Sequence, residues 1–259
     1  MRIPVYQVDA FASRLFAGNP AAICPLDKWL PDEQMQSIAA ENNLAETAFF
    51  VPDGERYQLR WFTPKVEVDL CGHATLASAF VIFNEFAPNG SSLRFETKSG
   101  ELTVTREGQL LSLNFPARPP GPCEAHPSLV RALGREPESI LGARDYLAIY
   151  SSEDDVRALR PDMGLLMDID RFAVIVTGPG KEADFVSRFF APAKGVPEDP
   201  VTGSAHCTLI PYWSKRLGKT KLHALQVSAR GGELWCEDRG DRVSMAGQAV
   251  KFLEGTIYL

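Results

Sequence analysis

The sequence predicts an α+β protein that consists of two copies of one module. The motif Asp69-Leu70-Cys71-Gly72-His73-Ala74-Thr75 has a second version, Asp199-Pro200-Val201-Thr202-Gly203-Ser204-Ala205, with Gly203 placed 131 residues after Gly72. Two further matches follow at nearly the same offset: Phe62-Thr63-Pro64 with Phe190-Ala191-Pro192, and Gly100-Glu101-Leu102 with Gly232-Glu233-Leu234. A period of about 130 residues suits a domain, whereas solenoid repeats span a few tens of residues. We therefore expect an N-terminal module over residues 1–117 and a C-terminal module over residues 118–250.

Each copy of the motif places its glycine directly before an apolar run. Residues 74–83 are apolar on every side at helical spacing, as in a helix buried inside a domain. Residues 204–217 form the corresponding helix, with Gly218 as its C-terminal stop, and Pro211 should bend this helix or delay its start. Backbone N–H groups at such helix starts attract anions. If the modules face one another, both ends meet in one cleft that suits a small carboxylate.

The remaining elements of the first module follow from apolar runs that end at turn residues. A helix is expected from Pro31 to Ala40, because proline is tolerated in a first turn. The expected strands are residues 3–10, 21–24, 48–51, 57–62, 93–97, 101–105 and 110–115.

A linker over residues 116–122, which holds four prolines, is expected to lead into the second module. Here the expected helices are residues 127–133 and 152–159. The expected strands are residues 146–150, 172–177, 234–236 and 242–245. The final segment, residues 251–259, lies beyond the repeat and is expected to return to the first module as a strand.

Composition and charge exclude several partner classes. The formal net charge is −6, from 27 basic and 33 acidic residues, and no basic run is present, which argues against nucleic acid and anionic membranes. The five cysteines are odd in number and lack a CxxC pair, which indicates reduced thiols in the cytoplasm and no structural zinc site. No stretch has the roughly 18 apolar residues that a membrane span needs.

Five motifs in order resemble the PhzF-like (phenazine biosynthesis-like) family, and the resemblance spans the chain from residue 7 to about residue 218. They are Gly18-Asn19-Pro20-Ala21, Asn43-Leu44-Ala45-Glu46-Thr47, Phe62-Thr63-Pro64, Cys71-Gly72-His73-Ala74-Thr75, and Glu198-Asp199-Pro200-Val201-Thr202-Gly203-Ser204-Ala205-His206. The resemblance implies the diaminopimelate epimerase-like fold, an α+β architecture of two pseudo-symmetric modules. Each module is a mostly antiparallel sheet wrapped around a central helix, the active site lies in the cleft between them, and such proteins are often homodimers.

The resemblance also implies an isomerase that moves a proton without a metal or an organic cofactor. In the phenazine enzyme the substrate is a dihydro-hydroxyanthranilic acid. The matching positions here are Glu46 as proton shuttle, with His73, Asp199 and Ser204 around the substrate ring. Ala45 stands where some members have serine, which removes one hydrogen bond to that substrate, so its identity does not carry over.

The residues around Glu46 agree with a proton-transfer role. A proton shift along an unsaturated acid needs one group that takes a proton from carbon and returns it nearby, and a carboxyl in an apolar pocket can do this. Leu44, Phe49 and Phe50 supply apolar surroundings. The alternative is a solvated acid at the edge of a strand.

The other candidates each have a structural alternative. His73 could bind a substrate oxygen or relay a proton, or be a satisfied structural group. Asp199 could orient a substrate amino or hydroxyl group, or cap the loop before the helix, and Ser204 could bind substrate or be an ordinary N-cap. Gly72 and Gly203 would offer backbone N–H groups to the carboxylate. Asn19 could line the cleft or open a turn, and His206 is expected to be packed.

Cys71 raises a rival function. In two-thiol racemases and epimerases of this fold a cysteine precedes each glycine, but here Thr202 precedes Gly203. Because a threonine hydroxyl is far too weak an acid to be the second base, this alternative ranks below the isomerase, and Cys71 is expected to be a small buried residue.

A further alternative from another class is a non-catalytic protein that binds a small carboxylate at the two helix ends. Exchange of substrate hydrogen with solvent deuterium through Glu46 distinguishes the two, because a binding protein would not promote it. A cysteine hydrolase ranks lower, because no second histidine is placed by a motif near Cys71.

Overall fold

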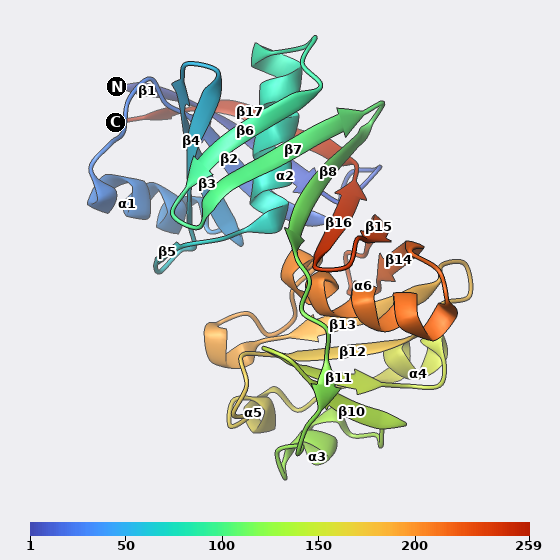
Figure 1. The fold of residues 1–259 in the computed structure, drawn as a ribbon. Coiled ribbons are helices and arrows are strands. Elements are labelled where there is room, and N and C mark those ends of the chain that lie inside the picture. The colour runs from blue at the N-terminus through green and yellow to red at the C-terminus, as the bar shows by residue number, and fades with distance from the viewer. The chain divides into compact units, whose positions relative to one another are not determined.

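The computed structural model describes residues 1–259, which divide into two compact units. The first unit consists of Met1–Asn114 together with Ala246–Leu259, and the second unit is Phe115–Met245 (Figure 1). The last strand, β17 (Ala249–Tyr258), pairs antiparallel along β1 (Arg2–Ala10). No helix combines the length and apolar character that a membrane crossing requires.

The first unit contains a mostly antiparallel sheet. Its other strands are β2 (Asn19–Pro25), β3 (Glu46–Asp53), β4 (Arg56–Phe62), β5 (Glu67–Val68), β6 (Ser92–Thr97), β7 (Gly100–Glu107) and β8 (Leu110–Pro116). The β2–β3 and β4–β6 pairs are parallel. The pairs β1–β17, β1–β2, β3–β4, β4–β5, β6–β7 and β7–β8 are antiparallel. Each expected strand of this module is present, and the predicted fold class is confirmed.

Helices cover both faces of this sheet. The central helix α2 (Gly72–Val81) packs against β1, β2 and β3, and its small residues let the strands approach closely (Figure 1). Helix α1 (Asp32–Asn42) contributes Met35 and Ile38 to a cluster with Phe49 and Phe62. Side chains alternate along a strand, so Phe50 points to the other face, where its ring contacts Phe86.

The second unit repeats this pairing order. Its elements are β9 (Gly121–Pro122), α3 (Leu129–Leu133), β10 (Ser139–Gly142), β11 (Tyr146–Ile149), α4 (Glu153–Ala158), α5 (Met163–Leu166), β12 (Val174–Pro179), β13 (Phe185–Phe190), η2 (Pro192–Lys194), α6 (Gly203–Leu217), β14 (Lys221–Gln226), β15 (Gly232–Asp238) and β16 (Arg242–Gly247). The β11–β12 and β13–β14 pairs are parallel, as are β2–β3 and β4–β6 in the first unit. The duplication read from the sequence is therefore a duplication of topology.

Helix α6 is the central helix of the second unit. Trp213 stacks on Phe185 of β13 and donates its indole N–H to Thr177 of β12. The expectation that Pro211 delays the helix start is wrong, because α6 begins at Gly203 and runs through the proline. Proline cannot donate to the carbonyl of Cys207, and the backbone N–H of Arg118 takes that place at 2.8 Å.

Several elements were missing from the sequence expectation. Strands β10 and β14, helix α5 and the short strand β9 inside the expected linker are present. The last strand is longer than expected, and the apolar run of α2 continues as a π-helical turn, η1 (Ile82–Phe86). The expected helix at residues 127–133 is shorter, because α3 begins only at Leu129.

Candidate active site

The first unit brings together Asn19, Glu46 and His73 from three elements. Asn19 begins β2, Glu46 begins β3 and His73 is the second residue of α2. Asn19 follows a tight turn at Gly18, where the backbone φ angle is +70°. A Cβ atom at Gly18 would lie 2.3 Å from the carbonyl oxygen of Ala10. Only glycine fits there, which explains the Gly-Asn-Pro motif.

The imidazole of His73 is the centre of this group. Its Nε2 lies 3.0 Å from Oε2 of Glu46, within ion-pair distance. Its Nδ1 lies 3.3 Å from Nδ2 of Asn19 and 3.5 Å from Sγ of Cys71. Asn19 and His73 are buried, and the Glu46 side chain is 18% exposed. The carboxylate is therefore largely shielded yet accessible, and it is not the solvated strand-edge acid of the alternative interpretation.

Charge is shared within this group. Burial of the imidazole works against protonation, but the neighbouring Cys71 and Glu46 outweigh it and raise the pKa of His73 well above its ordinary value. Burial raises the pKa of the Cys71 thiol, and the charge of Glu46 adds to this effect. The expected arrangement is an imidazolium beside a carboxylate.

The same three side chains could in principle hold a metal ion. The ligand atoms of Glu46, Cys71 and His73 lie within 4.8 Å of one another. A metal needs a deprotonated thiol and a neutral imidazole, whereas the raised pKa values of Cys71 and His73 favour the protonated forms. A metal ion bound here would have to displace the protons of Cys71 and His73.

In the second unit, Asp199 is a half-buried residue that bonds to the buried Thr202 and Gln226 ahead of α6. Its Oδ2 accepts a hydrogen bond of 2.5 Å from the hydroxyl of Thr202. Gln226 of β14 donates to the Asp199 carbonyl at 2.8 Å and accepts from the Thr202 backbone N–H at 2.8 Å. Sequence reasoning missed Gln226. The alternation of β14, in which Leu222, Ala224 and Gln226 are buried, was the available signal.

Ser204 is held by a second residue that the sequence did not reveal. Its Oγ accepts from Nη2 of Arg144 at 3.1 Å, and Arg144 is fixed by two hydrogen bonds, 2.9 and 2.8 Å long, to the buried Asp145. Because an arginine only donates, the Ser204 hydroxyl proton can point to another acceptor. No local pattern around Arg144 marks it in the sequence.

The two helix starts have no side-chain cap. The N-cap residues are Cys71 for α2 and Thr202 for α6, and neither forms a side-chain cap hydrogen bond. The alternative role of Ser204 as N-cap is therefore wrong, because Ser204 lies one residue inside α6. Gly72 and Gly203 are the first residues of their helices, where backbone N–H groups lack helical partners.

His206 is packed, as expected. It is fully buried, and its Nδ1 lies 2.8 Å from the carbonyl oxygen of Thr202. Burial lowers its pKa to about 4. Thr202, the residue in the position of a second thiol, donates its hydroxyl to Asp199, so a two-thiol mechanism has no support from this unit.

Two repeated α+β units, with a buried carboxylate–histidine pair at the central helix start of the first, define a protein of the epimerase-like fold class. A predicted epimerase from Pseudomonas aeruginosa has this fold, with a TM-score of 0.77 and 17% identity over 99% of both chains. The family model for phenazine biosynthesis-like protein matches residues 8–255. The chain belongs to this family.

Relatives across the full length place it among isomerases. An uncharacterized isomerase of Pseudomonas aeruginosa is 55% identical over 260 residues, which is 100% of both chains. The crystal structure of a PhzF family protein from Enterococcus faecalis is 48% identical, covers 100% of both chains and has a TM-score of 0.98. The chain is accordingly an isomerase of the phenazine biosynthesis-like family.

Proposed function

We propose that this isomerase shifts a proton on a small carboxylate-bearing substrate, unsaturated or cyclic, with Glu46 as general acid and base. The observation that supports this most is the 3.0 Å contact between the Glu46 carboxylate and His73 in a largely buried position. A carboxylate that His73 keeps in place in a largely buried position can act as the base that accepts a proton from carbon.

The proposed step balances without a co-reactant. Glu46 removes a proton from one carbon, the C–H electron pair moves into the conjugated system of the substrate, and a C–H bond then forms at a second carbon as Glu46 returns the proton. His73 supplies positive charge beside the reacting carboxyl group while negative charge develops on the substrate. Because the same carboxyl accepts and returns the proton, the chemistry needs neither a second base nor an electron acceptor.

Substrate binding is assigned in this proposal to the uncapped helix starts and to the polar groups of the second unit. Backbone N–H groups at Gly72 and Gly203 suit a carboxylate. Asn19 fixes the orientation of His73, Ser204 offers a hydroxyl proton, and Asp199 orients a donor group of the substrate. The homodimer and the cytoplasmic location expected from the sequence remain predictions.

The test is a screen of small unsaturated and cyclic carboxylates by thermal shift, followed by proton NMR of each ligand that stabilises the protein. The expected result is an isomer of the same mass from at least one ligand, with Glu46→Gln binding that ligand but not converting it. Ligands that bind to the wild type and are never converted would support the carboxylate-binding alternative instead.

A further inference from the structure

The C-terminal end of helix α2 leads into an unusual backbone turn. Residues Ile82–Phe86 form a single π-helical turn, with the N–H of Ala87 donating to the carbonyl of Ile82 at 2.7 Å. Its sequence, Ile-Phe-Asn-Glu-Phe, contains neither glycine nor proline. Single π turns are rare and recur at functional positions.

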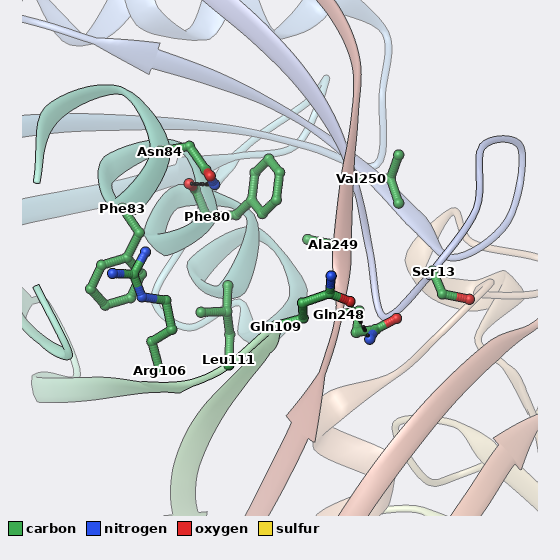
Figure 2. Close-up of a pocket in the computed structure, with 11 residues that line it drawn as sticks. Ser13, Phe80, Phe83, Asn84, Arg106, Gln109, Leu111, Gln248, Ala249 and Val250 are labelled. Atoms are coloured by element: carbon green, nitrogen blue, oxygen red, sulfur yellow. Dashed lines mark hydrogen bonds between the residues drawn. The ribbon is translucent and has the colours of Figure 1, made fainter. Parts of the chain in front are cut away.

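A cavity of about 360 Å³ lies against this turn, and all of its lining residues belong to the first unit. Phe83 and Asn84 of the turn and Phe80 of α2 form part of the wall (Figure 2). The volume is within the range of small-molecule sites, roughly 300–1,000 Å³. Phe80 lies eight residues after Gly72, so the cavity is about 12 Å along α2 from the His73 end.

Arg106 supplies the charge of this cavity. Its guanidinium lies over the Phe83 ring, 4.5 Å from the ring centroid, and its Nη2 donates to the carbonyl oxygen of Pro88. The Phe83 ring is itself held from behind, because a Cβ at Gly90 would lie only 3.3 Å from it. The position of the guanidinium is therefore set by packing before any ligand binds.

This guanidinium has no carboxylate partner. The part-buried Arg60 and Arg188 are each paired through two hydrogen bonds with a glutamate. Glu85, in the same π turn as Phe83, pairs instead with Lys251 at 2.9 Å. A fixed guanidinium without an internal counter-charge, on the wall of a cavity, is suited to an external anion.

The other residues of the cavity wall indicate which chemical groups the anion would carry besides its charge. Gln248 donates to Gln109 at 3.1 Å, which leaves an amide donor on Gln109 and an amide oxygen on Gln248 facing outward. In Figure 2 these amides lie across Leu111 from Arg106, so charge and amides flank an apolar surface.

We propose that this cavity is a second binding site, separate from the Glu46 group, for a small organic carboxylate with an aromatic or alicyclic body. Arg106 binds the carboxylate, Phe80 and Leu111 contact the body, and Gln109 binds a polar substituent. A phosphate or a dianion fits less well, since the wall offers one cation.

The test uses benzoate, with neutral benzamide as its matched control, and isothermal titration calorimetry on the full chain. Benzoate should bind and benzamide should bind more weakly. Arg106→Met should weaken benzoate binding roughly 10- to 100-fold, as expected for the loss of a charge-assisted hydrogen bond, while Arg106→Lys retains part of it. Gln109→Glu, at an exposed position, should weaken binding without disturbing the Arg106–Phe83 stack.

Location is checked with crystals soaked in 4-bromobenzoate, whose bromine is found by anomalous scattering. Bromine beside Arg106 and Phe80 supports the site, whether or not a second molecule is found near His73. Bromine only near His73, or equal affinity for benzoate and benzamide, or unchanged affinity in both Arg106→Met and Gln109→Glu, would overturn it.

Discussion

At the scale of single residues, His73 and Glu46 each influence the charge of the other side chain. Burial normally lowers the pKa of a histidine, but Cys71 and Glu46, which lies 3.0 Å away, together raise the pKa of His73 well above its ordinary value. In turn, the imidazolium keeps the Glu46 carboxylate supplied with a counter-charge inside a largely buried site. The proposed proton transfer through Glu46 rests on this pair.

We predict that His73 remains protonated well above the pH at which an ordinary histidine titrates. Nitrogen-15 NMR of the histidine side chains across a pH series measures this directly. In Glu46→Gln the titration of His73 should move to lower pH, because the negative neighbour is lost while burial remains. A His73 that is neutral at pH 7 in the wild type would contradict the proposed charge state.

His206 provides the opposite case. Its folded-state pKa is about 4, below the ordinary value near 6.5, so between these values the unfolded chain binds a proton that the folded chain does not. Stability should therefore fall as the pH drops from about 6.5 to 4, by up to about 3 kcal/mol for this group, and level off below.

Urea unfolding at several pH values measures this loss. His206→Asn, whose amide can still donate to the Thr202 carbonyl, should lose that part of the slope, whereas His223→Asn in β14 should keep it. An identical pH slope in wild type and His206→Asn would show that His206 is not responsible.

At the scale of elements, helix α6 shows how a proline is accommodated. Pro211 removes the N–H that would bond to the Cys207 carbonyl, and the N–H of Arg118 replaces it. We predict that Pro211→Ala raises the free energy of unfolding by less than about 1 kcal/mol, although a proline in an exposed helix interior costs about 3 kcal/mol. Denaturant unfolding measures the difference, and a gain near the full cost would mean that the Arg118 contact contributes little.

Most helices, α5 excepted, and most strands could be predicted because each is specified locally. The apolar run after Gly72 indicated a buried helix, and Gly218, with φ of +66°, ends α6 as a glycine should. The π turn at Ile82–Phe86 could not be predicted, since the periodicity of the run continues through it. Strand β14 was missed because its buried positions include a glutamine, which reads as polar until Thr202 and Asp199 are seen to bond it.

Some residues of the candidate site could also be predicted from the sequence, and others could not. Asn19, Glu46 and His73 were identified from motifs, and their convergence in the first unit depends on the parallel β2–β3 pair, which sequence patterns do not specify. Arg144 and Gln226 act through contacts distant in sequence, with Ser204 and with Thr202 respectively, and no spacing rule connects them. That the residues of both units serve one substrate is still a prediction.

At the scale of the whole molecule, the last strand of the chain returns to the first unit and completes its sheet. Strand β17 pairs with β1 from Tyr258 opposite Arg2 to Ala249 opposite Ala10, so the first unit is completed only when the end of the chain is present. The second unit, Phe115–Met245, is continuous in sequence, and its strands β9 to β15 pair among themselves.

We predict that deletion of residues 249–259 destabilises the first unit far more than the second. Removing β17 exposes the edge of β1 and breaks a full ladder, at a cost of about 1 kcal/mol for each lost hydrogen bond. Hydrogen exchange should then show lost protection along β1 and retained protection along β11. Unchanged protection of β1 would contradict the structural role of the strand.

The most direct test of the central claim follows hydrogen on the substrate. Once the carboxylate screen yields a substrate, it is incubated in D₂O with wild type or Glu46→Gln, and the deuterium bound to carbon is measured by mass spectrometry and NMR. The account predicts deuterium at the reacting carbons with the wild type. It also predicts a rate at least about a hundredfold lower with Glu46→Gln, while substrate binding is retained. Exchange by Glu46→Gln at the wild-type rate would contradict the account, because the proton would then move through another group.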